Sequence, residues 1–178
     1  DIDIASILTS EQIREKFKNT SLKVIDTGIK HGTVTVVSNN QKVEITTLRK
    51  DVSTDGRHAS VVFTNDWEDD SRRRDFTFNA IYMNEKGKIF DPHHGVSDLK
   101  NKVVKFIGNP DQRIKEDYLR ILRFVRFCAL FKSPIYPNEY ISFFLKHKNL
   151  ILNLKQKKIF TEIEKALANG LNRFGKIT

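Results

Sequence analysis

The feature that most constrains the fold is a change in the spacing of apolar residues near residue 108. Before this point, short apolar runs are separated by turn residues, as is typical of strands. After it, apolar residues recur every three or four positions, which predicts helices at residues 110–131, 137–148 and 155–169. Strands followed by helices predict an α+β fold, with a small mixed sheet in residues 1–107 and a helical domain in residues 108–178.

The sheet is predicted to contain a hairpin with a defined register. Strands are expected at residues 22–26, 33–37 and 42–48, and Asn39-Asn40 provides a two-residue turn between the last two. The register that follows from this turn pairs Val34 with Ile45, Thr35 with Glu44 and Val36 with Val43. Val and Ile then share one face of the sheet, and Glu44 lies on the polar face.

A strand at the start of the chain carries two carboxylates on one side. Asp1 and Asp3 are two positions apart, so they lie about 7 Å apart on one face, while Ile2 and Ile4 lie on the other. At an effective dielectric constant of about 20 the two charges repel each other by about 2 kcal/mol, which Mg²⁺ would reverse. If this strand lies beside the hairpin, Glu44 becomes a third carboxylate. The alternative is a solvated edge strand with two surface acids.

The connecting segments are less regular. A capping box formed by Thr9 and Gln12 predicts a short helix that buries Ile13 and Phe17. Residues 49–74 are polar and charged, and they are expected to form a long mobile connection. Residues 75–90 then return to sheet-like character around a turn at Glu85-Lys86-Gly87.

The segment Arg72-Arg73-Arg74-Asp75 places three cations beside one acid. Because a guanidinium group can bind two phosphate oxygens at once, this arrangement suits phosphate groups and a ribose hydroxyl. The alternative is a solvated loop whose charge is neutralised by Glu68, Asp69 and Asp70.

Arginines also recur at every third position of an apolar helix, at Arg120, Arg123 and Arg126. A stripe of this kind is costly in a core and therefore indicates function. Asp117 and Arg120 are three positions apart, so they are neighbours on a helix and present acceptors beside a donor fork, the complement of a nucleobase edge. The alternative is an intrahelical ion pair, with Glu116 and Asp117 capping the start of the helix.

Composition narrows the classes of protein and partner. No apolar stretch reaches the roughly 20 residues that a membrane span needs, and no signal peptide is visible, so a cytoplasmic protein with no membrane partner is expected. The single cysteine, Cys128, lies in an apolar helical run and is expected to fill the core rather than act as a nucleophile.

The net charge of +9 is unevenly distributed along the sequence. Residues 132–178 contain nine Lys or Arg and three acids, which accounts for +6 of it. This excess favours a polyanionic partner such as RNA, although a solvated lysine-rich helix face would also explain it.

Four segments in order resemble motifs A to D of the class II tRNA nucleotidyltransferase and poly(A) polymerase family. They are Asp1-Ile2-Asp3, Arg73-Arg74-Asp75, residues 91–99 and residues 116–120. Residues 27–34 and 43–49 are also similar to this family, so the resemblance covers nearly all of residues 1–131. It implies a DNA-polymerase-beta-like head followed by a helical neck.

The activity that the resemblance implies is template-independent addition of nucleotides to an RNA 3′ end, by preference of CCA to tRNA from CTP and ATP. Poly(A) addition by the same family, or RNA or nucleotide binding without catalysis, are the alternatives. The family's glycine-rich segment precedes its Asp-x-Asp strand and further domains follow its neck, so the chain is expected to be part of a longer protein.

The resemblance also implies individual roles. Asp1 and Asp3 would hold Mg²⁺ ions that bind the triphosphate and activate the primer 3′ hydroxyl, with Glu44 as the candidate third carboxylate. Asp117 and Arg120 would pair with the base, and residues 91–99 would form a hinge between head and neck. The nucleotide-binding residues implied are Arg73, Arg74, Asp75, Glu116, Asp117, Arg120, Arg123 and Arg126.

Overall fold

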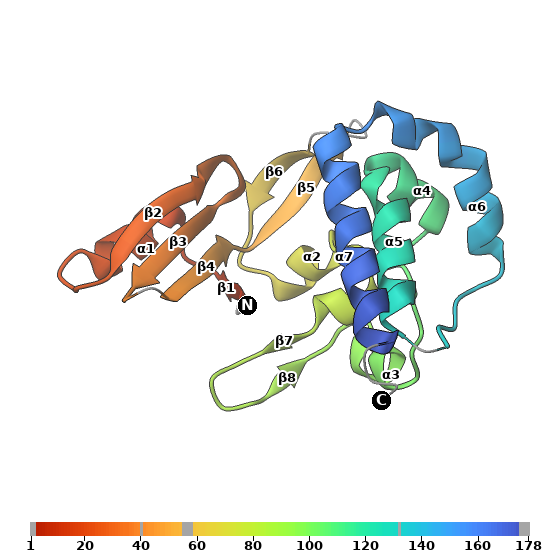
Figure 1. Ribbon diagram of the computed structural model, residues 1–178. Coiled ribbons are helices and arrows are strands. Elements are labelled where there is room, and N and C mark those ends of the chain that lie inside the picture. Colours follow the sequence, from red (N-terminus) through yellow and green to blue (C-terminus); the bar gives the residue numbers. More distant parts are fainter. Residues whose placement is uncertain (1–2, 40, 55–58, 132, 175–178) are drawn as a thin grey trace. The chain divides into compact units, whose positions relative to one another are not determined.

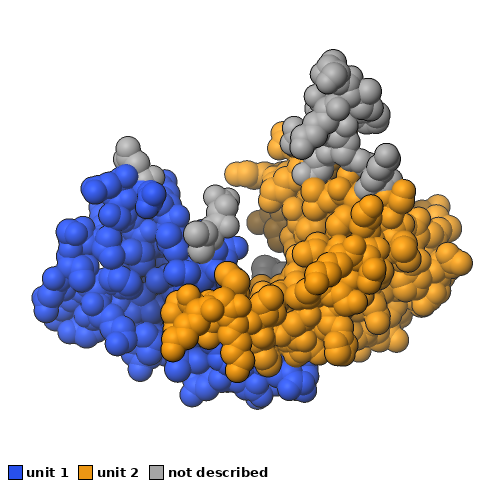
Figure 2. Space-filling view, turned by 90° about the horizontal axis from the view of Figure 1, so that it is seen from below, with its two compact units in different colours: residues 1–53, 59–73 blue, residues 54–58, 74–178 orange. Residues whose placement is uncertain are grey.

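The structure of the chain is a computed structural model that describes residues 3–39, 41–54, 59–131 and 133–174 (Figure 1). The chain divides into two compact units, shown in different colours in Figure 2. Unit 1 comprises Asp1–Ser53 and Ala59–Arg73, and unit 2 comprises Thr54–His58 and Arg74–Thr178. No helix in the described ranges is both long and apolar enough to cross a membrane.

Unit 1 contains a four-stranded sheet, a two-stranded ribbon and short helices. Its elements are β1 (Asp3–Ser6), α1 (Ser10–Phe17), β2 (Lys23–Gly28), the 3₁₀ turn η1 (Ile29–His31), β3 (Thr33–Ser38), β4 (Gln41–Thr47), β5 (Arg49–Thr54), β6 (Ala59–Phe63) and α2 (Trp67–Arg72). The sheet has the order β1-β4-β3-β2, and β5 pairs with β6.

The predicted hairpin register is confirmed. Antiparallel β3 and β4 pair Val34 with Ile45, Thr35 with Glu44 and Val36 with Val43. Asn39 adopts a positive φ of 40°, as expected in a tight turn of this kind, while Asn40 lies outside the described residues. The β1 strand lies alongside β4 in parallel, so the mixed character of the sheet is also confirmed.

Helix α1 covers the apolar face of this sheet. The Thr9 side chain accepts a hydrogen bond from the Gln12 backbone N–H, and the Gln12 side chain accepts one from the Thr9 N–H, so the predicted capping box is present. The helix contributes Ile13 to a core that also contains Val34, Val36 and Ile45, with Phe17 packed at its edge. The opposite face of the sheet is thereby left for the polar residues.

Unit 2 is mainly helical. Its elements are the 3₁₀ turn η2 (Thr77–Ala80), β7 (Tyr82–Met83), β8 (Ile89–Phe90), α3 (Gly95–Lys100), α4 (Pro110–Glu116), α5 (Leu119–Leu130), α6 (Glu139–His147), the 3₁₀ segment η3 (Lys148–Asn153) and α7 (Gln156–Phe174). Strands β7 and β8 form a hairpin around the predicted Glu85-Lys86-Gly87 turn. The α+β class is confirmed, whereas the predicted domain boundary between residues 107 and 108 stays a prediction.

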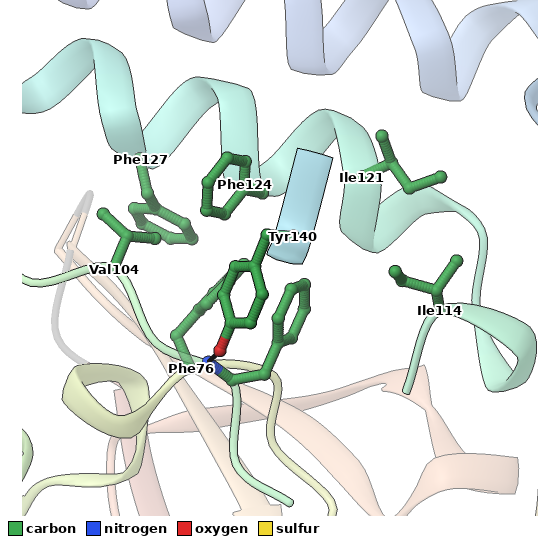
Figure 3. Packing of buried hydrophobic residues seen from close by; sticks show 8 residues of the cluster. Phe76, Val104, Ile114, Ile121, Phe124, Phe127 and Tyr140 are labelled. Carbon is green, nitrogen blue, oxygen red and sulfur yellow. Dashed lines mark hydrogen bonds between the residues drawn. The ribbon is translucent and has the colours of Figure 1, made fainter. Parts of the chain in front are cut away.

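An aromatic core holds unit 2 together (Figure 3). Phe76 and Phe106 are almost fully buried, and their ring centroids lie 4.7 Å apart. Tyr140 reaches into this core from α6, and its hydroxyl accepts a hydrogen bond from the Phe106 backbone N–H at 3.1 Å. Cys128 packs at the edge of the cluster, and burial raises the pKa of its thiol to about 12, so it fills space as predicted.

Two predictions of secondary structure were wrong. Residues 49–74 contain the β5–β6 ribbon and α2 rather than a long irregular connection. The ribbon was missed because its apolar residues do not mark a buried face, with Val52 and Val62 both more than half exposed. The helix expected over residues 110–131 is two helices, α4 and α5, because Asp117 has extended backbone angles (φ −154°, ψ 106°).

Candidate active site

Unit 1 places two carboxylates side by side on the polar face of its sheet. In the parallel β1–β4 pair, Asp3 lies directly opposite Glu44, so the two residues share a face. Glu44 is also opposite Thr35, whose hydroxyl lies 2.9 Å from that of Thr27. Asp3 and Glu44 are both exposed, and neither makes an ion pair or side-chain hydrogen bond within the described part of the chain. Both carboxylates therefore remain available to a ligand.

These donors fit a divalent cation, because carboxylate oxygens are the ligands that Mg²⁺ prefers in proteins. Asp1, the other predicted metal ligand, lies outside the described residues. Within the described ranges no group of three or more His, Cys, Asp or Glu side chains is arranged to hold a metal. The structure thus brings together two of the three predicted acids.

Unit 1 also contains Arg73, the first of the predicted phosphate-binding arginines. Its guanidinium contacts the Asp70 carboxylate through Nε at 2.9 Å and Nη2 at 2.8 Å. Asp70 is 1% exposed. Arg73 is therefore held by a buried acid on the preceding helix, α2.

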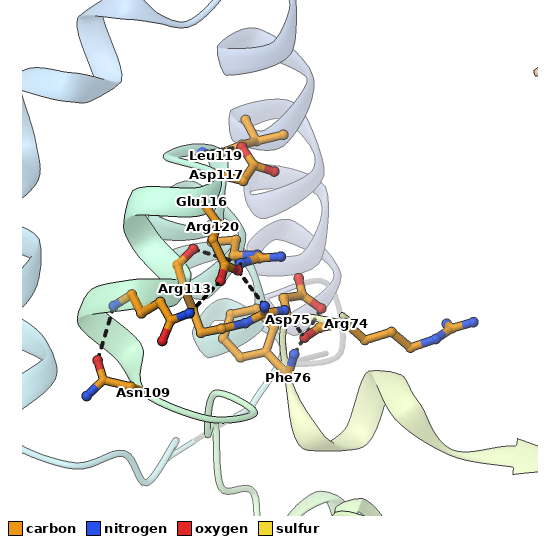
Figure 4. A network of polar contacts seen from close by, with 10 residues as sticks. Arg74, Asp75, Phe76, Asn109, Arg113, Glu116, Asp117, Leu119 and Arg120 are labelled. Carbon is orange, nitrogen blue, oxygen red and sulfur yellow. Dashed lines mark hydrogen bonds and ion pairs between the residues drawn. The ribbon is translucent and has the colours of Figure 1, made fainter. Parts of the chain in front are cut away.

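In unit 2, Asp75 is held by several polar contacts, of which Figure 4 shows the one with Phe76. One carboxylate oxygen accepts hydrogen bonds from the Phe76 backbone N–H and the Asn79 side-chain amide, and the other accepts one from Arg123 Nε at 2.5 Å. Burial raises the pKa of the Asp75 carboxyl, but the Arg123 charge and these hydrogen bonds outweigh it, so the net pKa lies below its usual value. Asp75 is consequently an ionised and firmly oriented carboxylate.

Arg74 points in a different direction from Asp75. Its Nε donates to the Tyr82 hydroxyl at 3.0 Å, its Nη1 donates to the Asn79 carbonyl at 3.1 Å, and its guanidinium lies 4.9 Å from the centroid of the Tyr82 ring. These contacts fix the side chain against the β7–β8 hairpin by hydrogen bonding and a cation–π contact.

The break between α4 and α5 corrects the geometry predicted for the base-reading residues. Asp117 caps α4, and its carboxylate accepts a hydrogen bond from the Leu119 N–H at 3.0 Å, which stabilises the extended backbone at the break. Asp117 and Arg120 are therefore not neighbours on one continuous helix. The Arg120 N–H still donates to the Asp117 carbonyl at 3.1 Å, so the two residues remain in contact through the backbone.

Glu116 bridges the two helices. Its carboxylate accepts from Arg120 Nη1 at 2.8 Å and from Arg113, which comes from the preceding turn. Arg113 Nη2 in turn donates to the Arg74 carbonyl at 2.6 Å. Both arginines are 8% exposed. Glu116, one of the predicted nucleotide-binding residues, thus fixes the Arg120 side chain.

The remaining arginines of the stripe are also paired with acids. Arg126 forms an ion pair with Glu162 of α7, with Nε and Oε2 2.7 Å apart, although this contact is not aligned as a hydrogen bond. Arg123 Nη1 lies 3.9 Å from the same acid, and both arginines stack on the Phe127 ring. Whether Arg120, Arg123 and Arg126 also bind a nucleotide stays a prediction.

The predicted hinge, residues 91–99, is anchored locally. The Asp91 carboxylate accepts hydrogen bonds from the Gly95 and Val96 N–H groups at 2.7 and 2.9 Å and so caps α3. A Cβ atom on Gly95 would lie 2.2 Å from the Thr77 carbonyl oxygen, so only glycine fits there. Thr77 also donates its hydroxyl proton to Asp98 at 2.7 Å.

Two supporting residues, Arg113 and Glu162, were not predicted from the sequence, although each carried a usable signal. Asp70 was named there only as one of the acids that would neutralise the arginines of a solvated loop, and it does pair with Arg73. Arg113 lies three positions before Glu116, on the same side of a helix. Glu162 lies three positions after Ile159 and four before Ala166, on the inward face of α7, and an acid at such a position implies a buried cation.

Unit 1 thus carries two facing carboxylates on a mixed sheet, and unit 2 carries oriented arginines and acids on a mainly helical unit. This is the class of head and neck that the sequence motifs resemble, and comparison with known proteins identifies its family. Residues 1–105 match the family described as the Poly A polymerase head domain, and the chain belongs to that family. The resemblance noted from the sequence motifs is thereby confirmed.

Similar proteins extend this match beyond residue 105. The human protein named CCA tRNA nucleotidyltransferase 1, mitochondrial, is 42% identical over 173 residues, which is 96% of this chain and 40% of that protein. A CCA-adding enzyme from Streptococcus gordonii is 38% identical over 169 residues, or 94% of this chain and 41% of that enzyme. The crystal structure of the Bacillus stearothermophilus CCA-adding enzyme in complex with CTP superposes with a TM-score of 0.81 at 35% identity, covering 94% of this chain and 39% of that one. The chain thus spans about two fifths of the length of these relatives.

Proposed function

We propose that this chain is the head and the start of the neck of a template-independent RNA nucleotidyltransferase that adds CCA to tRNA 3′ ends from CTP and ATP. The observation that carries the proposal is the placement of Asp3 opposite Glu44 on the polar face of the sheet. The names of the relatives, which describe CCA addition and, in one case, a complex with CTP, support the choice of substrate.

Within this proposal, Asp1 and Asp3 hold Mg²⁺, with Glu44 as a third acid. A cation bound there would neutralise charge on the triphosphate and activate the primer 3′ hydroxyl for in-line attack on the α-phosphate, with pyrophosphate leaving. Arg73 and Arg74 bind phosphate oxygens, and Asp75 accepts a hydrogen bond from a ribose hydroxyl.

Base selection is assigned to the break between α4 and α5. Asp117 and Arg120 present an acceptor and a donor fork to the base, and Glu116 orients the arginine through its short contact with Nη1. Arg123 and Arg126 support the nucleotide from the next turns of α5. Each of these side chains already has a protein partner, so its conformation is largely fixed before the nucleotide binds.

The experiment that tests this function is incorporation of labelled CTP and ATP onto tRNA that lacks its CCA end. It should be done with this chain and with the full-length protein encoded by its gene. Addition of C, C and A supports the proposal. Addition of A alone favours poly(A) synthesis, the alternative that the description of the matching family favours. No incorporation by either form would leave a nucleotide- or RNA-binding protein without catalysis.

The metal assignment is tested by Asp3→Ala. Incorporation should fall at least about a hundredfold, because the variant lacks one of the acids that stabilise the transferring phosphate. The melting temperature should stay unchanged, since Asp3 is exposed. Glu15→Ala, which removes an exposed acid of the same unit, is the matched control. Chelation by EDTA should abolish incorporation and added Mg²⁺ should restore it, whereas undiminished turnover by Asp3→Ala would refute the assignment.

The compartment stays a prediction. A cytoplasmic location was expected from the sequence, and one relative carries the word mitochondrial in its name. Fluorescence microscopy of the tagged full-length protein would distinguish the two locations.

A further inference from the structure

We propose that Asp70 is a positioning residue that holds Arg73 in place against the strands carrying the predicted metal-binding acids. This inference rests on the proposed function, and it adds a residue that is not among the predicted site residues. The contacts from which it is argued lie within unit 1.

The first observation is the burial of the Asp70 carboxylate. The residue is 1% exposed, whereas its neighbour Asp69 keeps 26% of its side chain exposed and pairs with surface cations, Lys50 at 3.7 Å and Arg72 at 3.5 Å. A buried carboxylate is costly unless it is paired and hydrogen-bonded. The burial of Asp70 therefore indicates a structural role for its ion pair that the exposed pairs of Asp69 do not have.

The second observation is the set of groups that Asp70 binds. Its Oδ1 atom accepts hydrogen bonds from Arg73 Nε at 2.9 Å and from the Arg49 backbone N–H at 3.1 Å, and it lies 2.8 Å from Arg73 Nη2. Two contacts from one guanidinium fix its plane as well as its position. The hydrogen bond from the Arg49 N–H connects the same oxygen to the backbone just after β4.

The third observation is what this backbone connects to. The Leu48 N–H donates to the Ser6 carbonyl at 2.8 Å, so the end of β4 is bound to the end of β1. Strands β1 and β4 carry Asp3 and Glu44. A continuous path of hydrogen bonds and short backbone segments therefore runs from the two acids through the Asp70 carboxylate to the Arg73 guanidinium.

The consequence is that Asp70 sets where Arg73 can meet a phosphate. With 17% of its side chain exposed, Arg73 keeps limited access to solvent while Asp70 restricts its rotamers. An arginine that is free to rotate would pay an entropic cost when it binds the triphosphate, and Asp70 removes part of that cost.

The test is a double-mutant cycle on CTP affinity, measured by isothermal titration calorimetry with Mg²⁺ present. Asp70→Asn should weaken CTP binding about tenfold, because the neutral amide holds the Arg73 guanidinium less firmly than the carboxylate does. Arg73→Gln should weaken it at least as much, and the double variant should be no worse than Arg73→Gln alone. Asp69→Asn is the matched control and should change affinity less than twofold.

Arg73→Lys provides a variant that keeps the buried acid and the positive charge. Lysine cannot make the two-pronged contact with Asp70, so its CTP affinity should fall by about the same factor as in Asp70→Asn. Wild-type affinity in either variant, or additive losses in the double variant, would overturn the inference.

A second readout does not depend on nucleotide binding. In ¹⁵N NMR spectra, the Arg73 Nε–H signal, identified by its loss in Arg73→Gln, should exchange slowly with water in the wild type and rapidly in Asp70→Asn. Slow exchange in Asp70→Asn would show that something other than Asp70 holds Arg73. Failure of the wild type to bind CTP would instead count against the proposed function, while the NMR signal would still report on the Asp70–Arg73 contact.

Discussion

Replacement of Glu162 by Gln should destabilise unit 2 strongly, although the residue lies on a helix that carried no predicted site. Glu162 is 5% exposed, and its carboxylate lies 2.7 Å from Arg126 and 3.9 Å from Arg123. Removing one partner of a buried ion pair leaves the other charge uncompensated, which typically costs about 3–5 kcal/mol. Glutamine keeps the shape and one acceptor oxygen, and Arg123 retains Asp75, so the lower limit of about 3 kcal/mol is expected.

This free energy converts into a large change in melting temperature. Unit 2 has about 100 residues, for which the entropy of unfolding is about 0.2 kcal/mol/K near 60 °C. A loss of about 3 kcal/mol should therefore lower the melting temperature by about 14 °C. Circular dichroism at 222 nm, which follows the helices, is the suitable measurement.

Glu164→Gln is the matched control, because it makes the same chemical change at an exposed position of α7. It should shift the melting temperature by no more than about 2 °C, since surface substitutions usually change stability by less than about 0.5 kcal/mol. If Glu162→Gln melts within the same interval, the ion pair contributes nothing net and the reasoning from burial is refuted.

Three further predictions concern other contacts. Gly95→Ala should destabilise unit 2 by about 3 kcal/mol or more in urea unfolding, because the new Cβ would lie 2.2 Å from a backbone oxygen; a smaller loss would mean that the segment shifts easily. Thr9→Ala should cost unit 1 about 1 kcal/mol through loss of the capping box, and an unchanged urea midpoint would contradict this. Because the folded pKa of Asp75 is below its unfolded value, its ionised form stabilises the fold above about pH 4, and this contribution is lost as the pH falls further. The stability difference between wild type and Asp75→Asn should therefore be larger at pH 7 than at pH 3, and an equal difference at both pH values would refute the assignment.

The sheet of unit 1 could be predicted in detail because two independent signals agreed. The alternation of Val and Ile selects the buried face, and the Asn39-Asn40 turn selects which residues pair, so a shift by one residue would have exposed the apolar face. A position of the first strand beside the hairpin was only a condition for bringing Asp3 to Glu44; the structure meets this condition, with β1 parallel to β4.

The helical unit was harder to predict at the site itself. Apolar periodicity is nearly unaffected by a break of one or two residues, so residues 110–131 looked like one helix. The break depends on Asp117, whose carboxylate replaces a helical hydrogen bond with a local one to the Leu119 N–H. Aspartate is suited to such a capping contact, but sequence alone does not show which of several acids will make it.

The arginine stripe shows why burial and function were hard to separate from the sequence. Each arginine lies near an acid that compensates its charge: Arg120 near Glu116 of the previous helix, Arg123 near Asp75 and Arg126 near Glu162. Only the first of these acids is close in sequence, so the other two pairings depend on the tertiary fold. The cost of burying these three arginines is therefore offset by acids of the protein itself, without a bound nucleotide.

Two of the three acids, Glu116 and Asp75, also belong to the predicted nucleotide-binding set. The ion pairs that stabilise unit 2 therefore also fix the orientation of these groups before a ligand binds. A variant that breaks the Arg120–Glu116 or the Arg123–Asp75 pair should consequently lower both the melting temperature and the nucleotide affinity.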